Sequence, residues 1–248
     1  TEQAGGGVVR LILRSGRGNP ITPQLVADLN QSLDALAAAP PRALVLDADG
    51  SKIFSGGFAL PVIAHWDRPQ LRSFFEDFLS ALHKLLGLGC PTIAAVEGHA
   101  IAGGFILSLG CDLRIVSSGR IKLGLSEVDL GVAVPAGARV LLEARTSSQH
   151  ALRMAMRGEL IGSDRALEIG YADAASESPL EDALSWARQL ASKPGSGATV
   201  TRQLASHPIS SRMKRADEEG MDAFLETWFS ETGQTCIQAL AESLGGKS

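Results

Sequence analysis

The stretch AIAGGFILSLGCD, residues 100 to 112, places two adjacent glycines at the start of an apolar segment that ends at Asp112. It follows PTIAAVEG (91–98), a short apolar run typical of a strand buried on both faces. Glycines between a buried strand and a helix indicate that the backbone comes very close to another element or to a ligand. Free N–H groups at a helix N-terminus also attract negative charge, so these glycines are compatible with packing or with an anion site.

A second glycine pair occupies a similar place in the chain. The run LVLDADGSKIFSGGF (44–58) again sets glycines behind a buried strand. N–H groups from two separate loops that converge on one point would form an oxyanion hole, which stabilises negative charge on a reacting oxygen. On spacing alone, close packing of strands and helices remains the simpler interpretation of both pairs.

Strands and helices alternate outward from these two runs. VVRLILRS (8–15) and RALVLDAD (42–49) have the composition of strands, and RIKLGLSE (120–127) is expected to be another. Between the first two strands, Thr22 and a following proline open a helix with leucines at helical spacing, and a second amphipathic helix is expected over 69–88. This alternation predicts an α/β fold.

The second half of the chain becomes helical from about residue 135. SKPGSG (192–197) is the best linker candidate, which predicts a core over 1–191 and a helical region over 192–248. An apolar stripe in that region covers its own core or a neighbouring subunit, and packing within the chain is the default interpretation. The stripe consists of Met221, Phe224, Leu225, Trp228 and Phe229.

Composition narrows the class of protein. The chain has 248 residues, 45% of them hydrophobic, which supports one sizeable core or a core with a small appendage. A formal net charge of −4 and the lack of a Lys/Arg cluster argue against a nucleic-acid surface. No apolar run reaches membrane-spanning length, and the first residues lack the pattern of an export signal. Three scattered cysteines indicate reduced thiols, so we expect a cytoplasmic protein without a membrane or nucleic-acid partner.

Several common motifs do not occur in the sequence. It has no GxxxxGK[ST], no GxGxxG after its first strand and no GxSxG, which disfavours nucleotide binding and serine hydrolysis. Its five histidines show no metal-ligand spacing, so no metal site is expected.

The order of four blocks resembles the crotonase (enoyl-CoA hydratase/isomerase) superfamily over nearly the whole chain. The blocks are FSGGFAL (54–60), CPTIAAVEGHAIAGGFILSLGCDLRI (90–115), IKLGLSEVDLGVAVP (121–135) and RALEIGYAD (165–173). The resemblance implies a crotonase-type spiral of repeated ββα units with a C-terminal helical region used for trimerisation. It also implies homotrimers or dimers of trimers that act on an acyl-CoA thioester, with coenzyme A as part of the substrate and no separate cofactor.

The resemblance also implies roles for individual residues. Its two backbone oxyanion donors match Phe58 and Gly103, and its second glutamate matches Glu127. The position of the first glutamate of the hydratases holds Ile106. By the same resemblance, further substrate contacts are expected from Arg17, which would meet a coenzyme A phosphate, and from Gly57, Ala59, His65, Trp66 and Gly104, with Phe58 and Ile106 shaping the acyl pocket.

One carboxylate and two carboxylates support different reactions. Addition of water to a double bond uses two carboxylates that hold the water and manage its proton, whereas a single base suffices to move a proton between two carbons of an enoyl thioester. AGGFIL (102–107) and GLSE (124–127) resemble the single-glutamate Δ3,Δ2-enoyl-CoA isomerases. The resemblance therefore favours an isomerase with Glu127 as its base.

Other functions remain open from the sequence. They are an enoyl-CoA hydratase with altered acids, another crotonase-type lyase, decarboxylase or thioester hydrolase, and a non-catalytic acyl-CoA binding homologue. Asp129 is a possible second acid, because in an extended segment it would share a face with Glu127.

Overall fold

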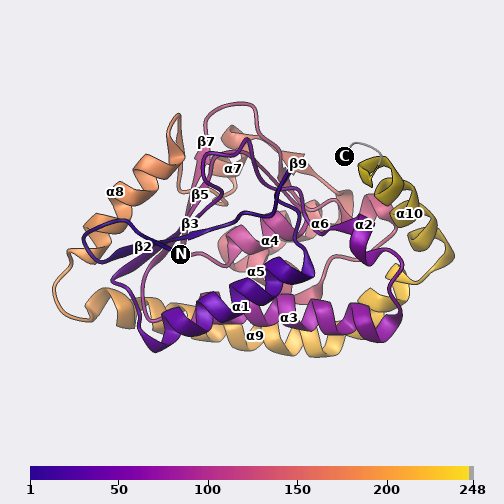
Figure 1. Cartoon of the computed structure of the whole chain (residues 1–248), viewed down its shortest axis with the longest axis horizontal. Coiled ribbons are helices and arrows are strands. Elements are labelled where there is room, and N and C mark those ends of the chain that lie inside the picture. The colour runs from indigo at the N-terminus through magenta and orange to yellow at the C-terminus, as the bar shows by residue number, and fades with distance from the viewer. Residues whose placement is uncertain (246–248) are drawn as a thin grey trace.

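Two sheets form the centre of the protein, whose computed structural model describes residues 1–245 (Figure 1). The larger sheet has the order β1-β2-β3-β5-β7-β10, parallel except for the antiparallel pair β1–β2. Its strands are β1 (Glu2–Gln3), β2 (Val8–Ile12), β3 (Ala43–Asp47), β5 (Thr92–Val96), β7 (Leu113–Ser117) and β10 (Ala174–Ser176).

The smaller sheet takes alternate strands from the same stretch of chain. Its order is β4 (Ile53–Ser55), β6 (His99–Ile101), β8 (Leu123–Gly124) and β9 (Leu160–Ile161), with β9 antiparallel to β8. In each of the pairs β3–β4, β5–β6 and β7–β8, the first strand joins the larger sheet and the second joins the smaller one. The expected spiral of repeated ββα units is therefore confirmed.

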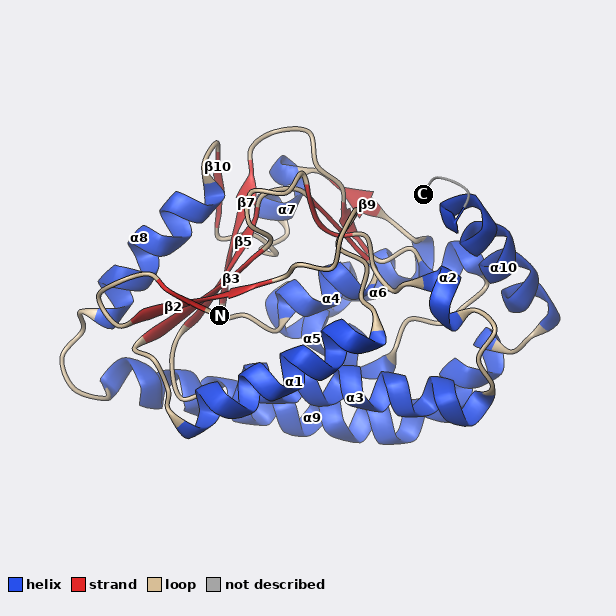
Figure 2. Cartoon of the chain, viewed as in Figure 1, coloured by secondary structure: helices blue, strands red, loops and turns tan. Residues whose placement is uncertain are grey.

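The helices surround these sheets (Figure 2). They are α1 (Pro23–Ala38), α2 (Leu60–Ile63), α3 (Arg68–Gly87), α4 (Gly103–Leu109), the 3₁₀ helix η1 (Glu127–Leu130), α5 (Ala136–Arg145), α6 (Ser148–Arg157), α7 (Ser163–Glu168), α8 (Pro179–Ala191), α9 (Gly197–Trp228) and α10 (Glu231–Gly245). Figure 1 shows α8 on one side of the larger sheet and α1, α3 and α9 side by side on the other.

The two faces of the larger sheet are buried by different means. Against α8, strand residues such as Val45 and Ile93 pack on the small side chains of Ala183 and Ala187. On the opposite face, α1 buries the leucines predicted for it, and the Thr22 hydroxyl accepts the Leu25 N–H at 3.1 Å as its N-cap. Burial on both faces explains why these strands are continuous apolar runs.

One predicted strand is much shorter than expected. Of residues 120–127, only Leu123 and Gly124 pair in β8, and the chain then turns into η1. Gly124 has φ +152°, and a Cβ on it would lie 2.3 Å from the Glu159 carbonyl oxygen. This left-handed backbone and close crossing end the strand before Glu127, so tertiary packing overrides the local pattern.

The C-terminal helices pack on the core of their own chain. α9 lies along α3 and α5, and α10 contacts α2 and η1. Met221, Phe224, Leu225 and Trp228 of the predicted stripe are buried there. Of the predicted region 192–248, residues 246–248 lie outside the described part. The division at 191, the trimer or dimer of trimers and the cytoplasmic location remain predictions.

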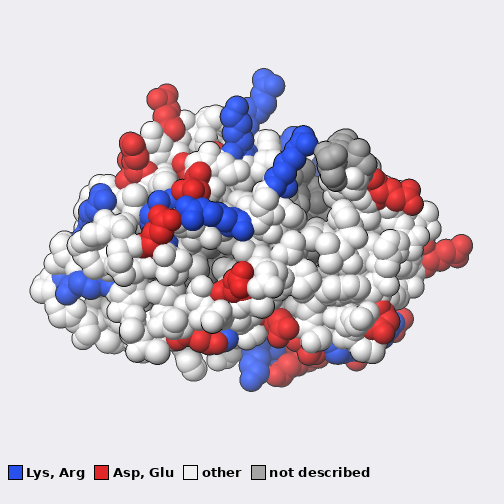
Figure 3. All heavy atoms as spheres, in the orientation of Figure 1, with Lys and Arg blue, Asp and Glu red and all other residues white. Residues whose placement is uncertain are grey.

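The charged side chains on one face of the molecule do not separate by sign. On the face drawn in Figure 3, charges of both signs are interspersed. Within residues 1–245, no helix has both the length and the apolar character needed to cross a membrane. The same residues contain no group of three or more acidic, histidine or cysteine side chains arranged to hold a metal ion.

The approach of Gly98 to β4 gives a test of how tightly the smaller sheet is built. A Cβ on Gly98 would lie 2.0 Å from the Lys52 carbonyl carbon, whereas a Cβ on Gly87 would meet no atom within 4 Å. Because backbone cannot give way cheaply, we expect Gly98→Ala to lower the free energy of unfolding by about 1–3 kcal/mol or more. Gly87→Ala, at the end of α3, is expected to have little effect or to stabilise slightly. Urea denaturation measures the free energy of unfolding of both variants. Equal stabilities of Gly98→Ala and Gly87→Ala would contradict the tight approach of Gly98 to Lys52.

Candidate active site

The first glycine loop leaves one backbone N–H unused. Ile21 donates its N–H to the Gly57 carbonyl at 2.8 Å, and Ala59 donates its own to the Ile21 carbonyl at 3.0 Å. Phe58 lies between these two bonds, so its N–H faces away from Ile21, as successive residues of an extended segment do. Among the described residues this N–H has no acceptor.

The second glycine loop lies directly against the first. A Cβ on Gly57 would lie 3.1 Å from the Ala102 Cβ and 3.6 Å from the Gly103 nitrogen. Ala102 has φ +50° and ψ −122°, a conformation costly for a residue with a side chain, and it turns the chain into α4. Gly104 has no room for a side chain, because its Cβ would lie 2.5 Å from the Ser55 carbonyl oxygen.

Where the two loops touch, unpaired backbone N–H groups make the site locally electropositive. Gly103 is the first residue of α4, so its N–H has no partner within the helix, and it has no other acceptor in the described chain. The N–H groups of Phe58 and Gly103 thus belong to two touching loops and are both unpaired. That is the arrangement an oxyanion hole requires.

Glu127 supplies the acid of this region. It begins η1, its side chain is 8% exposed, and neither carboxylate oxygen has a hydrogen-bond partner among the described residues. Burial raises the pKa of Glu127 to about 7, although the nearby backbone N–H groups of Glu127 and Ser126 favour the ionised form. The carboxyl is therefore poised to gain or lose a proton near neutral pH.

A cavity of about 90 Å³ adjoins Glu127 and the first glycine loop. Its lining is almost wholly apolar, and among the described residues Glu127 is the only ionisable one in it. The lining residues are Gly56, Phe58, Leu60, Phe75, Ala102, Ser126, Glu127, Leu130, Val132, Pro135, Phe224, Trp228, Leu240 and Leu244. A lone carboxyl in an apolar enclosure, next to unpaired N–H donors, suits proton transfer to and from carbon.

Phe58 occupies the border between this cavity and the core. Its ring lies edge-on to Phe74, Phe75 and Phe78, with centroids 4.9–5.7 Å apart. A Cβ on Gly103 would lie 2.9 Å from the Phe58 ring, so the ring also covers the start of α4. The Phe58 ring therefore narrows the space beside the N–H groups of Phe58 and Gly103. The backbone N–H of Phe58 does not depend on which side chain the residue carries.

Several predicted substrate contacts lie outside the cavity lining. Ala59 and Ile106 are buried, Ile106 fully, within the core. Arg17 is exposed on a loop that abuts the first glycine loop, since Gly56 donates its N–H to the Gly18 carbonyl at 2.9 Å.

His65 and Trp66 are also away from the site. The single turn of α2 carries the chain past the cavity, which leaves His65 exposed and places Trp66 in a groove between α1 and α3. There the Trp66 ring packs edge-on against Phe74, with centroids 5.7 Å apart. Packing on α3 explains why the structure does not bring these two residues to Glu127.

Asp129 does not accompany Glu127. The segment is a 3₁₀ helix rather than an extended strand, so the two carboxylates do not share a face. Asp129 is exposed and lies beside Gly158, whose Cβ would come within 2.8 Å of its carboxylate. The expectation that Asp129 shares a face with Glu127 is therefore wrong.

The C-terminal helices contribute a wall that the sequence did not assign to the site. Phe224 and Trp228 come from α9, and Leu240 and Leu244 from α10. The apolar stripe over 221–229 was the available signal, and it indicated packing without showing that a cavity lies behind it.

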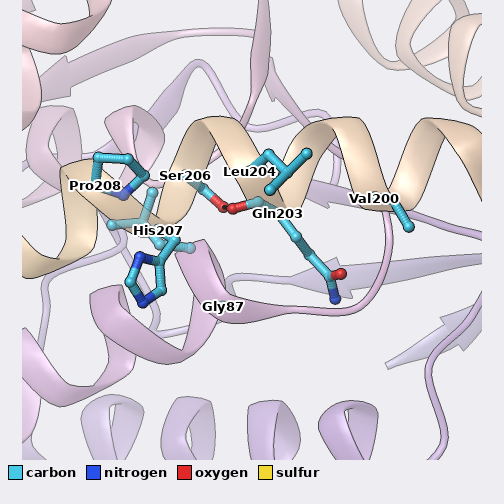
Figure 4. Close-up of a pocket in the computed structure, with 8 residues that line it drawn as sticks. Gly87, Val200, Gln203, Leu204, Ser206, His207 and Pro208 are labelled. Atoms are coloured by element: carbon cyan, nitrogen blue, oxygen red, sulfur yellow. Dashed lines mark hydrogen bonds between the residues drawn. The ribbon is translucent and has the colours of Figure 1, made fainter.

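A larger groove, of about 590 Å³, lies elsewhere, between the end of α3 and the first half of α9 (Figure 4). Gln203 and His207 project from α9 toward the turn at Gly87. Its lining has no carboxylate, and His207 is its only titratable side chain. Size alone would favour this groove, but the chemical groups are in the smaller cavity.

Comparison with known proteins places these features in one family. Residues 3–245 match the family model described as enoyl-CoA hydratase/isomerase. A Thermus thermophilus protein whose name places it with the enoyl-CoA hydratases is 31% identical over 88% of this chain and 86% of its own. An Arabidopsis thaliana protein named enoyl-CoA delta isomerase 3 is 30% identical over 73% of this chain and 82% of its own.

A solved structure gives the corresponding result for the fold. The crystal structure of human mitochondrial delta3-delta2-enoyl-CoA isomerase matches with a TM-score of 0.91, covering 100% of this chain and 97% of that one. The two sequences are 23% identical, so this similarity concerns the fold.

Burial of Glu127 predicts a pH-dependent effect on stability. With a pKa of about 7 against an ordinary 4.5, the folded protein holds a proton that the unfolded chain releases, so wild-type stability falls as pH rises from about 4.5 to 7. Glu127→Gln removes this loss. We expect equal stabilities near pH 4.5 and a variant more stable by about 3 kcal/mol at pH 8.5, measured by chemical denaturation. A difference that does not change with pH would mean that the carboxyl is hydrated.

Proposed function

The chain belongs to the enoyl-CoA hydratase/isomerase family, and we propose that within it the protein is an enoyl-CoA isomerase. It moves a double bond along the acyl chain of a coenzyme A thioester by proton transfer through one base. The observation that carries this proposal is the carboxyl of Glu127, which is buried without a hydrogen-bond partner and is the only ionisable group among the described residues that line the cavity.

Glu127 acts as the base and then as the acid. In its ionised form it removes a proton from C2 of a 3-enoyl thioester. The electrons of that C–H bond delocalise onto the adjacent thioester oxygen and, through the C3–C4 double bond, onto C4. The protonated Glu127 then returns the proton to C4, which leaves a 2-enoyl thioester. No water is consumed and no other group is needed to balance the proton. A carboxyl with a pKa of about 7 suits both steps at neutral pH.

The dienolate between these steps is stabilised by the main chain. Its negative charge develops on the thioester oxygen, and the N–H groups of Phe58 and Gly103 donate hydrogen bonds to that oxygen. Because the donors are backbone groups on touching loops, they are held in place before the substrate arrives. Arg17, on the loop beside Gly56, is suited to a coenzyme A phosphate.

Among the described residues the cavity lining holds no second acid, which favours isomerisation over hydration. The chain has Ile106 where hydratases of the family carry their first glutamate, and Asp129 is exposed beside Gly158. A water molecule at this site would have one carboxylate to hold it rather than two. The hydratase remains the second candidate, because relatives bear both names.

A substrate panel tests the isomerase. We expect the protein to interconvert matched 3-enoyl- and 2-enoyl-CoA thioesters and to form little 3-hydroxyacyl-CoA, as resolved by chromatography with mass detection. Deuterated solvent is expected to label C2 or C4 of the recovered thioester. Interconversion of 2-enoyl and 3-hydroxyacyl forms without movement of the double bond would overturn the isomerase in favour of the hydratase.

Two neighbouring acids provide a matched pair for the base. Glu127→Gln is expected to lower kcat by about 10²–10⁴-fold, because general base catalysis is lost, while the Kd for a saturated acyl-CoA changes only a few-fold. Asp129→Asn, two residues on and exposed, is expected to keep wild-type turnover. For the wild type, kcat/KM should rise with pH through about 7, because only ionised Glu127 accepts a proton. Full activity of Glu127→Gln would exclude the mechanism.

A further inference from the structure

The lining of the cavity beside Glu127 includes an indole, Trp228. The ring is 4% exposed and lies at the end of α9, where it contacts Phe75 and Phe224 at centroid distances of 5.8 and 6.1 Å. Aromatic rings packed at these distances restrict the rotation of the Trp228 ring. The position of the indole N–H is therefore set by packing.

The Trp228 N–H has no acceptor. Its nitrogen is buried and makes no hydrogen bond in the described chain, although buried indoles usually have a partner. Six buried side-chain polar atoms are unpartnered in the same residues. Of these, only the Trp228 nitrogen and the two Glu127 oxygens belong to residues that line this cavity. Glu127 is assigned to proton transfer, whereas Trp228 has no role in that step.

An unpaired donor discriminates between acyl chains. If a purely hydrocarbon chain fills the cavity, the N–H stays buried without a partner, whereas an oxygen on the chain satisfies it. Sites that hydrogen-bond a substrate oxygen reject the analogue that lacks it, because the protein group is then left unpaired. The indole only donates, so the matching group must be an acceptor.

Charge further restricts that acceptor. Among residues 1–245, no Lys, Arg or His lines the cavity, and the one ionisable lining residue is Glu127. A carboxylate on the acyl chain would be buried beside that acid with no cation to compensate it. A carbonyl, hydroxyl or ether oxygen carries no such penalty.

We propose that Trp228 is a specificity residue whose indole N–H donates a hydrogen bond to a neutral oxygen on the acyl chain, beyond the carbons that exchange the proton. The preferred substrates are then short oxygen-bearing enoyl thioesters, since a cavity of about 90 Å³ is small. The inference rests on the isomerase function proposed above and adds the chemical class of its acyl group.

Matched substrates test this directly. The probes are 3-enoyl-CoA thioesters of equal length in which one methylene beyond C4 is or is not replaced by an ether oxygen, with the oxygen moved along the chain. For the wild type we expect kcat/KM to be at least tenfold higher for one oxygen-bearing member than for the all-carbon chain. Trp228→Phe is expected to bring that ratio to about one, through a higher KM for the ether and little change in kcat.

A second wall variant separates hydrogen bonding from packing. Phe224→Leu changes the shape of the same cavity wall without removing a polar group. It should therefore change kcat/KM for the ether and for the all-carbon substrate by similar factors. The role of the indole would be overturned if Trp228→Phe lowered kcat/KM equally for both substrates. It would also be overturned if the wild type preferred the all-carbon chain at every oxygen position. The wild-type comparison holds even if Trp228→Phe does not fold.

Binding measurements keep this inference apart from the isomerase. If neither 3-enoyl thioester is isomerised, the proposed reaction fails. Calorimetry with saturated acyl-CoA, with and without the ether oxygen, still reports on Trp228. A tenfold tighter Kd for the ether that disappears in Trp228→Phe supports the hydrogen bond, and equal Kd values in the wild type overturn it.

Discussion

The site depends on how closely the start of α4 approaches β4. Gly104 meets the Ser55 backbone at a distance that excludes any side chain, and Gly57 meets Ala102 in the neighbouring turn. Ala102 keeps a positive φ to make this approach, a local cost that the surrounding packing sustains. Without this contact the two loops would separate, and their unpaired N–H groups would face different parts of the surface. The two strand pairs β3–β4 and β5–β6 carry the loops to this meeting point.

Burial then determines which chemistry the contact region of the two glycine loops can support. Glu127 would be an ordinary carboxylate in water, and its pKa rises because apolar residues from distant parts of the sequence enclose it. α9 and α10 supply much of that enclosure, so the helical region lines the cavity beside Glu127 as well as packing on the core. The fold thus links the basicity of one residue to side chains about 100 positions away along the chain.

The sequence predicted local structure best where the pattern was unambiguous. The helix after Thr22 and the buried strands around residues 43–47 and 92–96 follow directly from capping and apolar runs. The glycine pairs identified the meeting loops once the family resemblance was added. The shortening of β8 was not predictable, because it results from a crossing with Glu159. The separation of Asp129 from Glu127 and the place of Trp228 in the cavity depend on tertiary packing in the same way.

The division of labour between main chain and side chains has a consequence for how such a protein diverges. The proposed oxyanion hole consists of peptide N–H groups, so it is inherited with the backbone and survives replacement of the side chain at Phe58. The wall of the cavity is built from side chains, and there a single codon change alters which acyl group fits or how many acids are present. On this proposal a lineage can exchange its substrate or its reaction while the pair of backbone N–H donors stays the same. Relatives with isomerase and hydratase names would then share one scaffold.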